Sequence, residues 1–268
     1  MRSVWVVGAS TGIGKALVRE LDSAERTLYV SARNVSGLDQ LRDRSAAAIL
    51  PYPLDITDSV AVEKAAAAIG QSANGLDLLI VNAGTCEYID SDRIDTDAVR
   101  RVLETNFLGA GSVVNASLPL LRRAKALRPD INPQLVLVSS SVTYQALPRA
   151  GAYGASKAAL RYFAECLKID LQKEGIDVRI VSPGFVKTPL TDKNDFDMPF
   201  LLSAEVAARR IVRGLGGKQF DINFPYRFTK TLKLFSWLPA SWRFTLLSKM
   251  SRHEPPSGYG THVAGKSV

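Results

Sequence analysis

The feature that most constrains the fold of this chain is a regular alternation of short apolar runs with longer stretches of helical periodicity. The apolar runs are continuous, which indicates strands buried on both faces. Strands are expected at residues 4–7, 28–30, 49–54, 76–81, 135–138, 178–181 and 220–224. Helices are expected at residues 15–23, 59–72, 98–123, 156–174 and 204–215. This order predicts an α/β fold with right-handed crossovers and a doubly wound parallel sheet.

The net charge of +8 is unevenly distributed along the 268 residues. Residues 1–208 contain 23 Lys and Arg against 24 Asp and Glu, whereas residues 209–268 contain 11 against 2. A nearly neutral body argues against nucleic-acid binding as the main function. We therefore expect one domain over residues 1–224, a basic amphipathic helical extension over residues 225–252, and a disordered tail over residues 253–268.

Two scarce residue types exclude several classes of site. The only histidines are His253 and His262, and the only cysteines are Cys86 and Cys166. This excludes a zinc site built from His and Cys, a Ser-His-Asp triad in the body of the fold, and a disulfide scaffold, so we expect no metal. No apolar run approaches the roughly 20 residues that span a membrane. The first strand begins almost at Met1, so we expect no cleavable targeting segment and a cytoplasmic protein.

A glycine-rich turn lies between the first expected strand and the first expected helix. It reads Gly8-Ala9-Ser10-Thr11-Gly12-Ile13-Gly14, with the spacing G-x-x-x-G-x-G. Glycines permit a tight turn and close approach of a pyrophosphate to the free N–H groups of a helix N-terminus. The turn therefore predicts a dinucleotide site, although an ordinary strand-to-helix turn is the alternative.

The end of the second strand indicates which dinucleotide binds. An acidic residue there would accept a hydrogen bond from a ribose 2′-hydroxyl, whereas a 2′-phosphate calls for arginine. Here the strand runs into Ser31-Ala32-Arg33 with no carboxylate. This favours NADP(H) over NAD(H), with Arg33 on the 2′-phosphate; the alternative is a solvated surface arginine.

Tyr153 and Lys157 are candidates for acid/base chemistry. They are four residues apart on an expected helix, so both side chains project from one face. A free tyrosine has a pKa of about 10, and a neighbouring ammonium favours its phenolate. Ser140, at the end of the fifth strand, precedes Tyr153 by 13 residues.

Together these motifs resemble the short-chain dehydrogenase/reductases, specifically their short single-domain branch with a Rossmann fold. The resemblance covers about residues 3–224. It rests on the order and spacing of Gly8, Gly12, Gly14, Asp55, Asn82-Ala83-Gly84, Asn106, Ser140, Tyr153, Lys157 and Pro183-Gly184.

The resemblance implies a hydride transfer between a nicotinamide cofactor and a carbonyl or secondary alcohol. Tyr153 would be the general acid/base, Lys157 would lower the Tyr153 pKa and bind the nicotinamide ribose, and Ser140 would hold the substrate oxygen. Asn106 would fix a water in a proton relay. The resemblance also implies cofactor contacts from Asp55, Ile56, Asn82, Ala83, Gly84, Pro183, Gly184, Val186 and Thr188.

Other interpretations compete with this one. Ser140 could cap a turn, Asn106 could bind backbone inside its helix, and Asp55 or Thr188 could merely precede a helix. An isomerase or dehydratase acting on nucleotide-sugars would use the same Tyr/Lys pair, but the glycine spacing disfavours it. A cofactor-binding regulator without turnover is disfavoured by the intact catalytic residues.

Substrate and partners are less constrained. The segment over residues 190–202 lacks a period and predicts a mobile lid, whose apolar residues suggest an apolar pocket and a lipophilic substrate. The extension, with Lys, Arg, Trp and Leu interleaved and Pro239 dividing two short helices, suits an anionic membrane surface. Packing on the body, capping of the site or a dimer contact is the alternative. We expect a homodimer, with a tetramer as the other possibility.

Overall fold

The computed structural model describes residues 2–43, 45–90 and 92–250. Its centre is a parallel sheet of order β3-β2-β1-β4-β5-β6-β9. The strands are β1 Ser3–Val7, β2 Thr27–Ser31, β3 Ala48–Pro51, β4 Leu78–Val81, β5 Gln134–Val138, β6 Asp177–Pro183 and β9 Asp221–Phe224. This confirms the predicted doubly wound Rossmann architecture, with the order reversing between β1 and β4.

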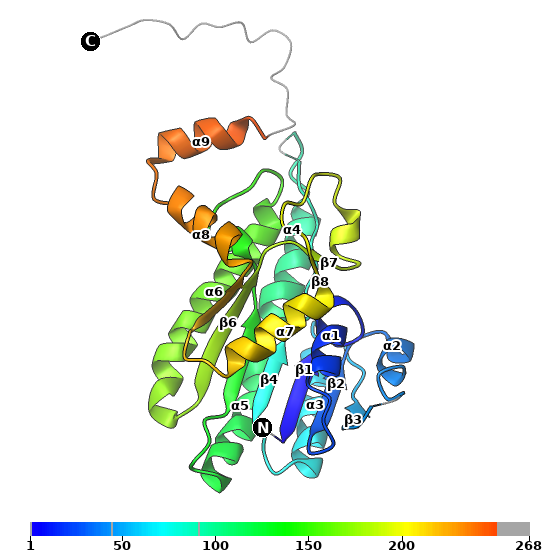
Figure 1. Cartoon of the computed structure of the whole chain (residues 1–268). Coiled ribbons are helices and arrows are strands. Elements are labelled where there is room, and N and C mark those ends of the chain that lie inside the picture. The colour runs from blue at the N-terminus through cyan, green and yellow to red at the C-terminus, as the bar shows by residue number, and fades with distance from the viewer. Residues whose placement is uncertain (1, 44, 91, 251–268) are drawn as a thin grey trace, which may run out of the picture.

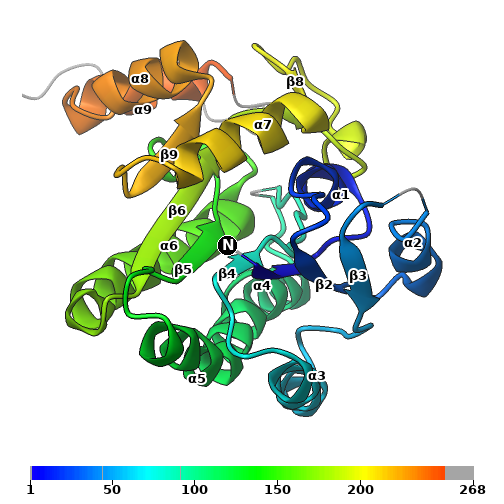
Figure 2. The same cartoon turned by 60° about the horizontal axis from the view of Figure 1, so that its bottom comes forward.

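Helices cover both faces of the sheet (Figure 2). One face carries α1 (Gly12–Glu20), α2 (Val35–Asp39) and α7 (Ala204–Leu215). The other carries α3 (Ser59–Ser72), α4 (Thr96–Leu103), α5 (Ala110–Leu127) and α6 (Gly151–Leu171). The result is a three-layer αβα sandwich.

Alternate residues of β1 show why its apolar run is continuous. Val4 and Val6 pack into the core beneath α1 and α7, whereas Trp5 and Val7 pack into the core beneath α3 and α5. All four side chains are buried. A strand with two buried faces requires apolar residues at every position, as the sequence predicted.

Two predicted helices match α3 and α7 at both ends, whereas the one expected over residues 98–123 is longer and interrupted. It begins at Thr96 in α4, passes through one π-helical stretch, η1 (Glu104–Gly109), and continues as α5 to Leu127. The short helix α2 has no counterpart in the sequence prediction. The π-helical stretch matters because it contains Asn106.

Two small features lie at the carboxyl edge of the sheet. A pair of short strands, β7 (Val186–Lys187) and β8 (Leu202–Ser203), brackets the lid segment. The C-terminal extension forms α8 (Tyr226–Phe235) and α9 (Ala240–Ser248), which meet at Pro239 as predicted (Figure 1). The predicted disordered tail over residues 253–268 lies outside the described residues. In the described part of the chain, no helix has the length and apolarity needed to span a membrane.

Candidate active site

Three adjoining cavities lie at the carboxyl edge of the sheet. The glycine-loop cavity, of about 510 Å³, follows β1, β2 and β4; the apolar cavity, of about 540 Å³, lies under the lid and α8; and the junction cavity, of about 110 Å³, lies between them. The parallel register brings these segments together, because Val7 pairs with both Ser31 and Val81. The residues that follow three strands thus meet at one edge.

The glycine-loop cavity collects most of the predicted cofactor residues. It is lined by Gly8, Ser10, Thr11, Gly12, Ile13, Arg33, Asp55, Ile56, Asn82, Ala83, Gly84 and Thr188. Asn34, Leu54, Thr105 and Leu190 also line it and were not predicted. Asn34 directly follows Arg33 in the sequence, which is the one signal that could have indicated it.

The glycine turn has a backbone shape that larger residues would resist. Gly8 has a φ of +86°, and a Cβ atom there would lie 2.5 Å from the Ala83 nitrogen. The Asn82 amide donates to the Gly8 carbonyl at 2.9 Å and so ties the turn to the end of β4. Gly14 lines none of the three cavities described; it is buried against Gly8.

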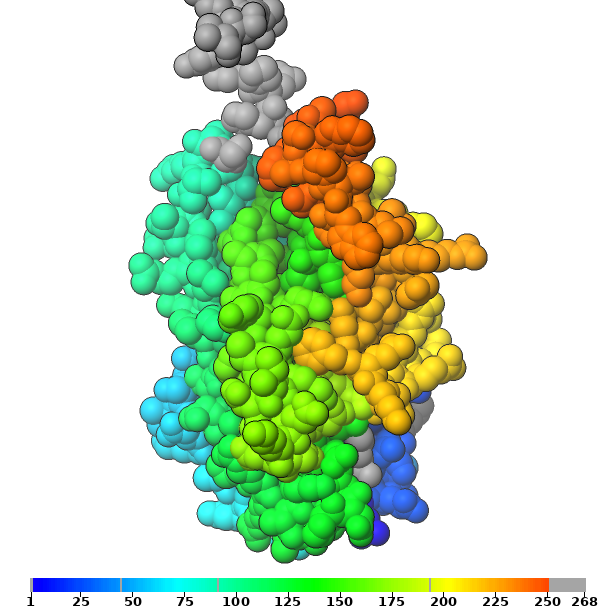
Figure 3. Space-filling model, turned by 90° about the vertical axis from the view of Figure 1, so that its left-hand side faces the viewer, coloured from blue at the N-terminus to red at the C-terminus, as the bar shows by residue number. Residues whose placement is uncertain are grey.

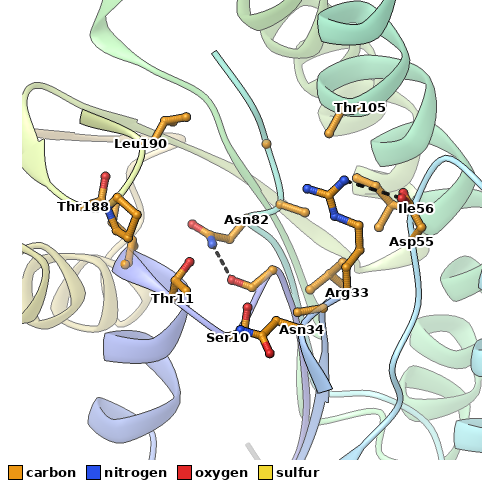
Figure 4. A pocket seen from close by; sticks show the side chains of 18 of the residues that line it. Ser10, Thr11, Arg33, Asn34, Asp55, Ile56, Asn82, Thr105, Thr188 and Leu190 are labelled. Carbon is orange, nitrogen blue, oxygen red and sulfur yellow. Dashed lines mark hydrogen bonds and ion pairs between the residues drawn. The ribbon is translucent and has the colours of Figure 1, made fainter. Parts of the chain in front are cut away.

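Arg33 and Asp55 lie at one end of the glycine-loop cavity (Figure 4). The Arg33 side chain is 76% exposed, and its Nη1 lies 3.7 Å from Asp55 Oδ2. Burial alone would raise the pKa of the Asp55 carboxyl, but hydrogen bonds from Thr57 and the Arg33 charge hold it below its ordinary value. A guanidinium is therefore held at the cavity rim beside an ionised carboxylate.

Tyr153 stands where the apolar and junction cavities meet. Tyr153 and Ser140 line both cavities, whereas Lys157 lines only the junction cavity. Lys157 Nζ donates to the Val138 carbonyl at 2.9 Å and lies 5.9 Å from the centre of the Tyr153 ring. The i, i+4 spacing on α6 thus places both side chains at one site, as predicted.

Burial dominates the electrostatics of this pair. Desolvation raises the pKa of Tyr153 to about 12, opposed by its hydrogen bond with Ser140. Desolvation also lowers the pKa of Lys157 to about 8. Tyr153 is therefore neutral at pH 7 and carries the proton that a general acid donates.

Asn106 lies behind this pair rather than on a cavity wall. Its Oδ1 accepts from the Thr85 N–H at 2.7 Å, and its Nδ2 donates to the Thr85 carbonyl and to Ser156 Oγ, each at 2.9 Å. The side chain is 1% exposed. Asn106 therefore joins η1 to the segment after β4 and to α6, instead of bonding backbone within its own helix.

The segment after β6 closes the junction cavity. Pro183, Gly184, Val186 and Thr188 all line it. The Thr188 methyl would lie 3.0 Å from a Cβ at Gly12, so the root of the lid packs on the glycine turn. The predicted lid contains a short 3₁₀ helix, η4 (Thr191–Lys193).

The apolar cavity includes residues that the sequence did not indicate. Tyr88 donates to Asn194 Oδ1 at 2.7 Å and contacts the Phe196 ring edge-on at 5.8 Å, which joins the segment after β4 to the lid. Arg149, at φ +64°, lies 5.4 Å from the Tyr88 ring centre and pairs with Asp90 and Asp195. Its charge is thereby offset, and the cavity wall is mainly apolar.

The glycine-loop and junction cavities fit a nicotinamide dinucleotide on their own geometry. Gly8, Gly12 and Gly84 line the glycine-loop cavity without side chains, and the Arg33 guanidinium lies at its far end. The junction cavity places Tyr153 and Lys157 beside the root of the lid. In the described residues, no group of three His, Cys, Asp or Glu side chains is arranged to hold a metal.

Comparison with known proteins agrees with this geometry. The family model described as "short chain dehydrogenase" matches residues 2–198. The chain belongs to this family. An uncharacterized oxidoreductase of Myxococcus xanthus (strain DK1622) is 33% identical over 241 residues, covering 89% of this chain and 93% of that one. Estradiol 17-beta-dehydrogenase 2 of Mus musculus is 30% identical over 199 residues, covering 72% of this chain and 50% of that protein.

A solved structure supports the fold. The short chain dehydrogenase from Burkholderia cenocepacia J2315, in complex with NADP, has a TM-score of 0.77 at 24% identity and covers 92% of this chain and 99% of that one. This short-chain dehydrogenase is therefore an oxidoreductase that acts on alcohol or carbonyl groups with a nicotinamide cofactor.

Proposed function

We propose that this short-chain dehydrogenase interconverts a lipophilic carbonyl compound and its secondary alcohol, with NADPH preferred and Tyr153 as the general acid/base. The observation that carries the proposal is the position of Tyr153 and Ser140, which line both the junction cavity and the apolar cavity. A reacting carbonyl at that boundary would lie within reach of both hydroxyl groups. The chemistry that the bound cofactor supplies is hydride transfer at its nicotinamide ring.

The proposed roles follow from what each side chain reaches. Tyr153 donates a proton to the substrate oxygen or accepts one from it, and Ser140 stabilises the charge that develops on that oxygen. Lys157, held by the Val138 carbonyl, adds a positive charge to the junction cavity and binds the ribose. Asn106 joins η1 to the segment after β4 and to α6, which carries Tyr153 and Lys157. It would also fix a water molecule in a proton relay.

The substrate class follows from the apolar cavity. Phe185, Phe196, Phe228, Leu232 and Phe235 line it, and its one arginine is paired with carboxylates. Each methylene group buried in such a cavity contributes about 0.8 kcal/mol. The name of the mouse relative, an estradiol dehydrogenase, agrees with a bulky lipophilic alcohol.

A panel of carbonyl compounds tests this proposal. With NADPH, kcat/KM should increase along a series of 2-alkanones by up to roughly fourfold per added methylene group, until the chain fills the cavity. Preferential reduction of small charged sugars would contradict the substrate class. If the protein reduces no carbonyl compound and oxidises no alcohol, the proposed oxidoreductase activity is wrong.

Replacing Arg33 tests the cofactor preference. The variant R33A should bind NADPH about 10 to 100 times more weakly, because it loses one charge-assisted contact to the 2′-phosphate, and its NADH affinity should change little. Fluorescence titration of both cofactors measures this. The variant R42A, which removes an exposed arginine outside the cavity, is the control. Tighter binding of NADH than NADPH by the unaltered protein would disprove the assignment.

We also propose a homodimer in the cytoplasm. Tyr162 and Ile169 of α6 are each 72% exposed, and Leu108 of η1 is also exposed, so α6 and η1 present apolar surface that a second subunit could cover. Light scattering that gives a monomer mass would contradict the dimer.

A further inference from the structure

The C-terminal extension forms a hairpin of α8 and α9, and one side of this hairpin is a wall of the apolar cavity. Phe228, Leu232 and Phe235 of α8, together with Leu247 and Met250 at the end of α9, line that cavity. The extension therefore docks on its own domain, beside the proposed site of reaction. Figure 3 shows it as a ridge that projects at this end of the molecule.

Specific contacts fix which side of α8 faces inward. Lys233 Nζ lies 3.4 Å from Asp221 Oδ2 and 4.4 Å from the centre of the Tyr144 ring. Tyr144 itself donates to Asp221 Oδ2 at 2.5 Å. The buried Thr229 donates to Asn223 Oδ1 at 2.6 Å. Because these contacts hold α8 at one rotation about its axis, the opposite side is held toward solvent.

The outer side of the hairpin is unusually apolar for a surface. We call it the hairpin face and define it as Tyr226, Leu234, Trp237, Trp242, Phe244 and Leu246, which are 47–84% exposed. The exposed Phe200 of the lid lies beside the inner side of α8, with its ring 6.0 Å from that of Phe228. Large exposed apolar side chains that gather on one short segment mark an interaction surface.

The charges beside this face identify its partner. Residues 225–250 contain five Lys and Arg and no Asp or Glu. Lys233 is used within the molecule, and Arg243 is half-buried beside Gln145, at 3.5 Å. Arg227, Lys230 and Lys249 are exposed. A second copy of this face would bring like charges together, whereas an anionic lipid surface takes up tryptophan and phenylalanine at its headgroups and attracts lysine and arginine.

We propose that the hairpin face binds the surface of an anionic lipid bilayer, and that a lipophilic substrate passes from the lipid into the apolar cavity beside α8 and α9. The second half of this proposal rests on the proposed function; the first half does not. The hairpin links lipid binding to substrate entry, because its inner side chains line the cavity and its outer side chains would contact the lipid. Binding would be peripheral and reversible, and it would weaken as salt screens the exposed cations.

Vesicle flotation tests the binding. The full chain should float with vesicles of phosphatidylcholine and phosphatidylserine and not with phosphatidylcholine alone. The double variant K230Q/K249Q should lower the vesicle affinity roughly 25-fold, at about fivefold for each cation removed. The triple variant W237S/W242S/F244S should abolish flotation. None of these residues lines a cavity, so thermal unfolding should show an intact fold.

A matched control and a substrate comparison complete the test. The variant V60S/L127S, which changes exposed apolar residues on α3 and at the end of α5, should float like the unaltered chain. No flotation with the anionic vesicles, or equal flotation of the hairpin variants, would overturn the proposal. If the hairpin variants instead lower the mass measured by light scattering and leave flotation unchanged, the face binds a second copy and the proposal is wrong.

The route of the substrate is measured separately. With a ketone dissolved in the vesicles, the triple variant should lose most of its kcat/KM, whereas its kcat/KM for a water-soluble ketone should stay unchanged. An equal loss for both ketones would overturn the route. A chain that floats but reduces no carbonyl would contradict the proposed function and leave the binding inference standing.

Discussion

The variant Y153F should lose turnover by about a hundredfold to ten-thousandfold, because positioned proton transfer contributes that much to a rate. The ring would still fill its place between the apolar and junction cavities, and only the hydroxyl would be missing. NADPH affinity and the melting temperature should therefore stay close to those of the unaltered chain. Steady-state reduction of the best ketone, fluorescence titration of NADPH and thermal unfolding give the three readings.

The variant Y162F supplies a control for that loss. Tyr162 is on the same helix, α6, but lines none of the three cavities, so removing its hydroxyl should leave the rate unchanged. Full activity of Y153F would disprove the mechanism. A loss of rate accompanied by an equal loss of NADPH affinity would assign Tyr153 to cofactor binding instead of proton transfer.

The variant G14A should be the most damaging change in the glycine turn. A Cβ at this position would lie 1.9 Å from the Gly8 carbonyl oxygen and 2.7 Å from Asn82 Nδ2. The Gly8 oxygen belongs to the backbone, and the Asn82 amide is held by its hydrogen bond to that same oxygen, so the turn must shift and this 2.9 Å bond must distort. Such overpacking costs about 1–3 kcal/mol, or roughly 3–10 °C in melting temperature for a chain of this size.

The shifted turn should also lose its complementarity to a pyrophosphate, so NADPH affinity should fall at least tenfold in the same variant. The matched control is G111A in α5, where a Cβ would meet no atom within 4 Å. There alanine should stabilise the helix by about 0.5–1 kcal/mol. If G14A has the melting temperature and the NADPH affinity of the unaltered chain, the proposed role of close packing in the turn is wrong.

The strands, and the predicted cofactor residues that follow them, could be predicted because local sequence patterns determine where each strand begins and ends. A run such as Val4-Trp5-Val6-Val7 is apolar at every position because both faces are buried, and the same run ends where the glycines must begin. The first residues of α3 and α7 were also predictable, since the side chains of Asp58 and Ser203 cap the N-termini of these helices. Local rules of this kind need no knowledge of the tertiary structure.

The wall of the apolar cavity depends on residues far apart in sequence. Tyr88 and Arg149 are separated by 61 positions, and no spacing rule links them before the chain has folded. The π-helical stretch at Asn106 escaped prediction for a related reason. Its side chain bonds to Thr85 and Ser156, and these tertiary bonds, rather than helical propensity, accompany the break.

The basic extension shows the same limit in another way. Its composition allowed a membrane contact, a subunit contact or packing on its own domain, and Pro239 correctly separated two helices. Only the fold shows that one side of α8 packs beside Tyr144 and Asp221 while the other side stays exposed. The composition of the segment indicated that it is basic and amphipathic, but it did not indicate which side of α8 packs on the domain and which side stays exposed.

The glycine-loop and apolar cavities share only one lining residue, Leu190, among the residues described. Arg33 and Asp55 mark the end of the first cavity near β2 and β3, whereas α8 follows β9 at the opposite edge of the sheet (Figure 2). The proposed dinucleotide site and the proposed lipid-binding face therefore lie toward opposite edges of the sheet. If the hairpin face binds lipid as proposed, the cofactor could be exchanged without release of that face, and we would expect many turnovers during each contact with the lipid surface.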